Sequence, residues 1–262
     1  MTDPHVELAE LSVAAIREEG MRLKAAAVAE ERLRRRLIRG VEEAQASAPR
    51  SLQVEAGPSQ VGTVCQRRLA AALAGVPGLP GADRWLATIG TAVHAWLDDA
   101  FAGDPNFVGD WEVQINLGAF TMRGTLDLYC RESATVIDHK VVGARSMDRI
   151  LRAGMPLVYK AQLALYALGL RQMGYETKAV ALALWPRESG LNNGKGMVMV
   201  SQAVDAEFLM FTDDLVNRIR QTQAELLKYH DDPATSGFEW ADTEKDCSFC
   251  PMQMRCSSYE RY

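Results

Sequence analysis

Residues 121–142 read TMRGTLDLYCRESATVIDHKVV and contain the pattern that decides the fold. Apolar and polar residues alternate along 121–130, which is the period of a β-strand with one buried face. Residues 135–142 form a second β-rich run after a turn-length gap, and residues 113–117 (VQINL) alternate in the same way before it. Three short strands joined by turns predict an antiparallel meander.

Helical and strand patterns continue on both sides of this meander. Residues 84–102 and 155–173 carry apolar side chains at helical spacing. Residues 178–186 are apolar almost throughout, which predicts a central strand buried on both faces. A further strand is expected at 197–203 and a long amphipathic helix at 205–229. This order predicts an α/β fold built around one mixed sheet, with helices flanking it.

The two ends of the chain differ from this middle part. Residues 6–46 predict one or two helices, whose second half is rich in arginine. That basic half is either a solvated helix face or an arm that contacts phosphate or a partner. Turn-forming residues at 47–63 predict a linker, so we expect an N-terminal helical extension at 1–50 and a main domain at 51–262.

Composition excludes several classes of protein. The chain has 262 residues, of which 48% are hydrophobic and 24% charged, as in ordinary globular proteins rather than disordered or collagen-like ones. Its apolar runs are too short to cross a bilayer, and its first residues, MTDPH, do not resemble an export signal. We therefore expect a cytoplasmic protein with no membrane partner. The net charge of −5 means that any nucleic acid must meet a local basic track.

Two carboxylates and an ammonium group converge in the predicted meander. Asp138 and Lys140 are two residues apart, so they project from the same face of a strand, and Asp127 approaches that face if the two strands pair. Carboxylate oxygens bind Mg²⁺ or Mn²⁺, and a lysine can offset charge on a phosphate. The group therefore suits metal-assisted hydrolysis of a phosphodiester. The alternative is a surface salt bridge between Asp138 and Lys140.

Four short motifs occur in a characteristic order: Gly-Thr-x-x-His at 90–94, Gly-Thr-Leu-Asp at 124–127, Ile-Asp-His-Lys at 137–140 and Gln-x-x-x-Tyr at 162–166. Together they resemble the RecB-like branch of the PD-(D/E)XK nuclease superfamily. The resemblance covers roughly residues 60–262. It implies a restriction-endonuclease-like core, in which helices flank a central mixed sheet.

The resemblance also implies roles for individual residues. Lys140 would be the catalytic lysine, and Gln162 and Tyr166 would contact DNA or hold the site in place. Glu112 matches a less constant acidic position and would act through a second metal ion or a water molecule. The implied metal ligands are His94, Asp127, Asp138 and the main-chain carbonyl of His139.

Four of the five cysteines form a second constellation. Cys247, Cys250 and Cys256 lie close together near the C-terminus, and Cys65 lies far upstream. This one-plus-three layout resembles the iron–sulfur members of the same family, the CRISPR-associated exonuclease Cas four and the AddB nuclease domain. It implies a [4Fe–4S] cluster in a C-terminal segment, with a structural Zn²⁺ ion or free thiols as alternatives. Cys130 lies outside the pattern and is interpreted as a small buried hydrophobe.

The function expected from this resemblance is that of a metal-dependent DNA exonuclease. It would act from ends and on single-stranded DNA, in recombination or repair, CRISPR adaptation or phage DNA processing. Arg145, Arg149 and Arg152 form either a track for the DNA backbone or an ordinary solvated face. Two rivals are a non-catalytic DNA-binding or adaptor protein of the same fold and a zinc-stapled structural protein. The N-terminal helices would mediate association with a second copy or a partner protein.

Overall fold

The structure, a computed structural model, describes residues 4–47, 55–76, 85–191 and 196–229, together with Cys247, Cys250 and Cys256. The chain divides into two compact units, Met1–Gln53 and Val54–Tyr262. Part of the expected linker at 47–63 and most of the C-terminal tail lie outside the described residues. No described helix is both long and apolar enough to cross a membrane.

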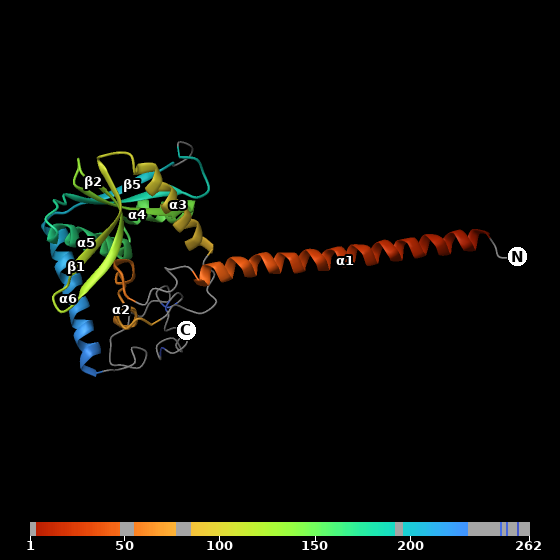
Figure 1. Ribbon diagram of the computed structural model, residues 1–262, viewed down its shortest axis with the longest axis horizontal. Helices are drawn as coiled ribbons and strands as arrows, with labels where there is room; N and C mark the ends of the chain where they lie inside the picture. Colours follow the sequence, from red (N-terminus) through yellow and green to blue (C-terminus); the bar gives the residue numbers. More distant parts are fainter. Residues whose placement is uncertain are drawn as a thin grey trace. The chain divides into compact units, whose positions relative to one another are not determined.

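The first unit contains one uninterrupted helix, α1 (Pro4–Ser47; Figure 1). Gly20 does not break it, since a glycine inside a helix costs only about 1 kcal/mol relative to alanine. Exposed ion pairs lie along its surface: the Glu31 carboxylate is 2.7 Å from Nε of Arg34 and 2.6 Å from Nε of Arg35. These are the three- and four-residue spacings at which helical side chains meet.

The second unit is built on a five-stranded mixed sheet in the order β1-β2-β3-β4-β5. The strands β1, β2 and β3 form the predicted antiparallel meander, β3 pairs in parallel with β4, and β4 pairs antiparallel with β5. The predicted central strand is confirmed, because β4 lies between β3 and β5 and is buried along its middle. The strand bounds are Phe107–Asn116, Thr121–Cys130, Thr135–Val142, Ala179–Pro186 and Val198–Ala203.

Helices cover the sheet on both faces. A parallel strand pair needs a crossover connection, and here α4 (Ala144–Ala153) and α5 (Leu157–Gln172) provide it between β3 and β4. The main core joins α5 and α6 (Ala206–Tyr229) to one face, and a smaller cluster packs Phe101 of α3 (Trp85–Phe101) on the other. The remaining helices are the 3₁₀ turn η2 (Pro58–Gln60) and α2 (Gln66–Leu73).

In both β1 and β2, the side chains change from one face of the sheet to the other at a single pair of residues. Leu126 points into the main core, yet Leu128 points into the smaller cluster and Tyr129 returns to the main core. Strict alternation would put Leu126 and Leu128 on the same face. The change occurs where the pairing skips Asp110 and Asp127, and Asp110 has a φ of 45°. Asp127 therefore lies at the point where the side chains of the strand change faces.

Candidate active site

The strands β2 and β3 separate at Asp127. Their pairing ends with Leu128 opposite Ile137, and the same register would place Asp127 opposite Asp138. In place of a main-chain hydrogen bond, the Asp127 carboxylate accepts the N–H of His139 at 2.7 Å. The separation therefore leaves the two aspartates opposite each other where the strands diverge, close enough for their charges to interact.

Each aspartate is paired with a cationic or potentially cationic side chain. Nζ of Lys140 lies 2.5 Å from Oδ2 of Asp138, and Nδ1 of His94, on α3, lies 3.4 Å from Oδ1 of Asp127. The Asp138 side chain is only 1% exposed and that of Lys140 19%. The surface salt bridge considered as an alternative is therefore wrong, because this ion pair is buried.

The pairing of Asp138 with Lys140 does not satisfy the carboxylate. The Lys140 ammonium is the only described side chain that contacts its oxygens, through Oδ2, and Oδ1 has no hydrogen-bond donor among the described atoms. Burial raises the pKa of Asp138 to about 6, although the charge of Lys140 acts in the opposite direction. A buried carboxylate held in this way is costly, which makes it a candidate ligand.

The other titratable groups of the site differ in charge. Burial alone would raise the pKa of Asp127, but the hydrogen bond and charge of His94 outweigh it and lower that pKa. Burial likewise opposes the charged form of His94, and Asp127 more than compensates, so the pKa of His94 is raised. His139 lies on the side of the sheet that His94 covers, with the two ring centroids 5.9 Å apart, and its Nδ1 accepts a hydrogen bond from Trp185 at 3.2 Å. Burial lowers the pKa of His139 to about 4 and keeps its imidazole neutral.

Gln162 and Tyr166 are both buried on α5, as their four-residue spacing predicts. The Tyr166 hydroxyl donates to the main-chain carbonyl of Thr125, two residues before Asp127, at 2.7 Å. Gly124 permits this packing, because a Cβ there would lie 2.7 Å from Pro58 and 3.0 Å from the Tyr166 ring. Tyr166 thus fixes α5 to the strand that carries Asp127.

The acidic residues nearest to the candidate site are Asp98 and Asp110, whereas the sequence predicted Glu112. Glu112 is exposed on β1 opposite Thr125, and no described contact joins it to His94, Asp127 or Asp138. Asp110 lies opposite Asp127 instead, and Asp98 approaches from α3. Burial, followed by the charges of Asp110 and Asp127, raises the pKa of Asp98. The four-residue spacing of His94 and Asp98 was a signal for this second acid.

The arginines Arg145, Arg149 and Arg152 are exposed on α4. Buried Met147 and Ile150 hold the opposite face of this helix against the domain. Arg145 and Arg149 share a face, as expected from a helix over these residues. The exposed face is therefore basic and follows directly after the strand that carries Lys140.

Three of the four cysteines of the predicted cluster lie at or near α2. Cys65 is the N-cap of this helix, and buried Cys250 packs with Cys256 against Ala71. Arg67, itself buried, places Nη1 3.6 Å from Sγ of Cys256. Burial lowers the pKa of Arg218, and the charge of Cys65 acts against this shift. One arginine thus lies against the Cys256 sulfur, and a second is near enough to Cys65 for their charges to interact. Cys130 is half-buried beside Leu128.

Metal-binding geometry is not preformed at either place. Among the described residues, no group of three or more His, Cys, Asp or Glu side chains is arranged to hold an ion. Two of the predicted ligands, His94 and Asp127, are paired with each other, and a third, Asp138, is paired with Lys140. The donor types nevertheless fit Mg²⁺ or Mn²⁺ at the carboxylates and a thiolate-bound metal centre at the cysteines.

The family of the chain follows from a comparison with protein-family models. The model of the PD-(D/E)XK nuclease superfamily matches residues 6–257. The chain therefore belongs to the PD-(D/E)XK nuclease superfamily. Its mixed sheet with helices on both faces is the core that the sequence predicted for this superfamily. No curated protein matches the chain.

Several solved structures are similar to the chain at low identity. One is a protein designated SSO0001, with 15% identity, a TM-score of 0.48 and coverage of 87% of this chain and 97% of the other. A phage-related exonuclease from Haemophilus somnus 129PT has 11% identity, a TM-score of 0.45 and coverage of 68% and 96%. The alkaline exonuclease LHK-Exo from Laribacter hongkongensis has 11% identity, a TM-score of 0.46 and coverage of 67% and 91%. These similarities carry no inference about activity.

Proposed function

We propose that this chain is a metal-dependent DNA nuclease that hydrolyses phosphodiester bonds and acts as an exonuclease from DNA ends, on single strands. The observation that carries the proposal is the Asp138 carboxylate, which is buried, has Lys140 as its one described cationic partner and lies opposite Asp127 in the register of the two strands. Membership of the nuclease superfamily supports it.

His94, Asp127 and Asp138 would hold Mg²⁺ or Mn²⁺, with the main-chain carbonyl of His139 as a fourth ligand. These are hard oxygen donors and one imidazole, which suit such ions. When bound, the ion would neutralise charge on the phosphate and lower the pKa of a coordinated water molecule.

The side chains of the site have separate tasks in this proposal. Lys140 holds an ammonium group beside the carboxylates and would stabilise the charge that develops on the phosphate. The face of the Tyr159 ring, 5.0 Å from Nζ of Lys140, orients this group. Gln162 and Tyr166 are positioning residues, since Tyr166 ties α5 to β2 through the Thr125 carbonyl.

The arginines of α4 would hold the DNA backbone. The chain has a net charge of −5, so attraction for DNA must come from a local basic surface. Arg145, Arg149 and Arg152 provide one next to the site. Binding through these contacts would weaken steeply with added salt, because it releases counterions from the DNA.

We further propose that Cys65, Cys247, Cys250 and Cys256 hold a [4Fe–4S] cluster, with Zn²⁺ as the alternative. Arg67 and the charge of Arg218 would compensate negative thiolates. Such a centre would link α2 to the C-terminal segment and stabilise the fold by closing a long loop. Anaerobic purification tests this: brown protein containing iron supports the cluster, and colourless protein with stoichiometric zinc supports the alternative.

The N-terminal helix would serve association with a second copy. Leu33, Leu37 and Val41 follow each other at four-residue spacing on α1, and all three are exposed. Light scattering of the full chain, compared with a variant carrying Leu33→Glu and Leu37→Glu, tests this. A dimeric chain that becomes monomeric in the variant supports the proposal, and a monomeric unaltered chain contradicts it.

The nuclease proposal is tested with end-labelled linear and circular DNA, in single- and double-stranded form, with Mg²⁺ or Mn²⁺. Degradation of linear single strands, with circular DNA left intact, is the expected result. Cleavage of circular DNA would contradict action from ends. DNA binding without any cleavage would identify a non-catalytic DNA-binding protein of the same fold.

A further inference from the structure

A cavity of about 290 Å³ lies beside the proposed active site. The end of β3, the helix α4, the start of α5 and the first turns of α3 enclose it. Its wall is apolar on the side of α3 and β3 and polar on the side of α4. Its lining residues include Leu86, Ile89, Ser146, Arg149, Tyr159 and Arg187.

The charges around this cavity favour an anion. Arg149 and Arg187 both line it, and the lining residues include no carboxylate. Guanidinium groups are suited to a phosphate, which they bind through paired hydrogen bonds, and the one acid paired with them is Glu188, which is not a lining residue. Arg149 is exposed on α4 and contributes its charge to the lining of the cavity.

Next to the cavity, one of its lining arginines already holds an anion. The Glu188 carboxylate lies 3.1 Å from Nη2 of Arg187 and accepts a hydrogen bond from the N–H of Ala144, the first residue of α4. Gly143 leaves room for both side chains, since a Cβ there would lie 2.7 Å from Arg187 and 2.9 Å from Glu188. Glu188 is exposed, so it can leave this position at low cost.

The remaining walls suit a planar base. Tyr159 offers an aromatic ring, and Leu86 and Ile89 add an apolar wall from α3. Bases stack on aromatic rings without regard to sequence. The same Tyr159 ring lies 5.0 Å from Nζ of Lys140, so the cavity and the proposed active site share this side chain. A strand whose phosphate lies at Lys140 would therefore reach the cavity with a neighbouring nucleotide.

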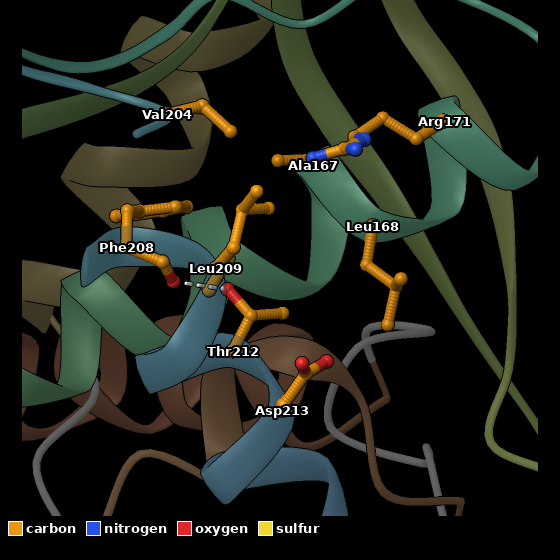
Figure 2. A pocket seen from close by; sticks show the side chains of 9 residues that line it. Ala167, Leu168, Arg171, Val204, Phe208, Leu209, Thr212 and Asp213 are labelled. Atoms are coloured by element: carbon orange, nitrogen blue, oxygen red, sulfur yellow. Dashed lines mark hydrogen bonds between the residues drawn. The ribbon is translucent and has the colours of Figure 1, made fainter. Parts of the chain in front are cut away.

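A second cavity, between α5 and α6, is different in character (Figure 2). Its volume is about 220 Å³, and apolar side chains such as Leu168 and Leu209 line it. Its two charges are opposite in sign, from Arg171 and Asp213. It has no excess of positive charge and provides a control arginine, because Arg171 lies at the other end of α5 from Tyr159.

We propose that the cavity beside Tyr159 binds one nucleotide of the substrate strand, adjacent to the phosphate that is cleaved. Arg149 and Arg187 hold its phosphate, which replaces the carboxylate of Glu188 at the start of α4. Tyr159, Leu86 and Ile89 hold its base. This inference rests on the proposed nuclease function and adds the residues that place the strand.

The test measures binding of thymidine 5′-monophosphate by calorimetry in EDTA, with thymidine and inorganic phosphate as probes of each half. The unaltered chain should bind the nucleotide about tenfold more tightly than either probe, since both halves contribute. Arg149→Gln and Arg187→Gln should each weaken binding about tenfold, and Glu188→Gln should strengthen it. Arg171→Gln removes the same charge elsewhere and should leave the affinity unchanged.

Several results would overturn the proposal. These are equal affinity in the Arg187→Gln variant and the unaltered chain, weaker binding in Glu188→Gln, or no nucleotide binding at about 10 mM, the range of the weakest specific sites. Inorganic phosphate binding as tightly as the nucleotide would remove the base site. Because no divalent ion is present, nucleotide binding is measured independently of cleavage. A protein that binds the nucleotide as expected but cleaves no DNA refutes the nuclease proposal alone. A protein that cleaves DNA but does not bind the nucleotide as expected refutes the cavity proposal alone.

Discussion

Two ion pairs of similar length behave in opposite ways in this protein. On α1, Glu31 is exposed, and its bonds to Arg34 and then Arg35 lower its pKa to about 2. In the sheet, Asp138 lies 2.5 Å from Lys140, yet burial raises its pKa to about 6. Both acids have a cation close by. The difference is water, which solvates the first carboxylate and is removed from the second.

This comparison indicates where to look for function. An exposed pair contributes little to folding and is readily replaced. A buried pair that leaves its carboxylate strained is retained at a cost in stability, and such costs are concentrated at functional sites. Substitutions in the two ion pairs and at Tyr166 test this contrast, and we expect the largest effect at Lys140 and the smallest at Glu31.

The largest effect is expected on catalysis. Lys140→Ala should lower the rate of cleavage of linear single-stranded DNA by about 10³-fold or more, because it removes a preorganised charge from the reacting phosphate. The rate is measured with Mn²⁺ on end-labelled DNA. The variant should keep the circular dichroism spectrum of the unaltered chain, and unchanged cleavage would refute the role of Lys140.

The second effect is on stability, and it has the opposite sign. Asp138→Asn should abolish cleavage but stabilise the metal-free protein at pH 7 by on the order of 1–3 kcal/mol, because it removes the cost of ionising a buried carboxylate. The folded chain binds this proton more tightly than the unfolded chain, so the stability of the unaltered protein falls as pH rises from about 4 to about 6.

This second prediction is measured by urea denaturation in EDTA between pH 4 and pH 8. The advantage of the Asn variant should be absent near pH 4 and complete above pH 6. Parallel pH profiles for the two proteins would show that the Asp138 carboxylate is not strained.

A smaller loss is expected at Tyr166. Tyr166→Phe removes the buried hydrogen bond to the Thr125 carbonyl and should destabilise the domain by about 1–2 kcal/mol. Because Tyr166 positions β2, the Michaelis constant for DNA should change less than the turnover number. Denaturation and steady-state cleavage measure the two effects, and unaltered values of both would refute the positioning role.

The smallest effect is expected on α1. Glu31→Gln breaks both exposed ion pairs and should leave the melting temperature and the cleavage rate unchanged, since solvent screens these charges. Differential scanning calorimetry at low and high salt provides the measurement. A clear drop in melting temperature would show that α1 depends on these pairs.

The sequence predicted the parts of the site that depend on local pattern. Alternation along 121–130 and 135–142 gave the hairpin, and the two-residue spacing of Asp138 and Lys140 put them on one face. Helical spacing likewise placed Gln162 and Tyr166 together on α5. These features follow from the period of a single element and need no knowledge of the rest of the fold.

The parts that the sequence did not predict depend on pairing between distant elements. Glu112 was expected near the metal site, but the face exchange at Asp110 and Asp127 turns it to solvent. Arg187 lies beside Gly143 because the parallel register pairs Val142 with Pro186 across the crossover. No local spacing relates residues 143 and 187, so only the folded sheet brings these two together.

The hydrogen bond from the His139 amide to the Asp127 carboxylate makes the backbone sensitive to the chemistry beside it. Anything that draws this carboxylate away, whether a cation or a proton, leaves the amide without its acceptor. Deuterium uptake at that single N–H would then report whether a cation or a proton is bound at the Asp127 carboxylate, even in a variant that does not cleave DNA.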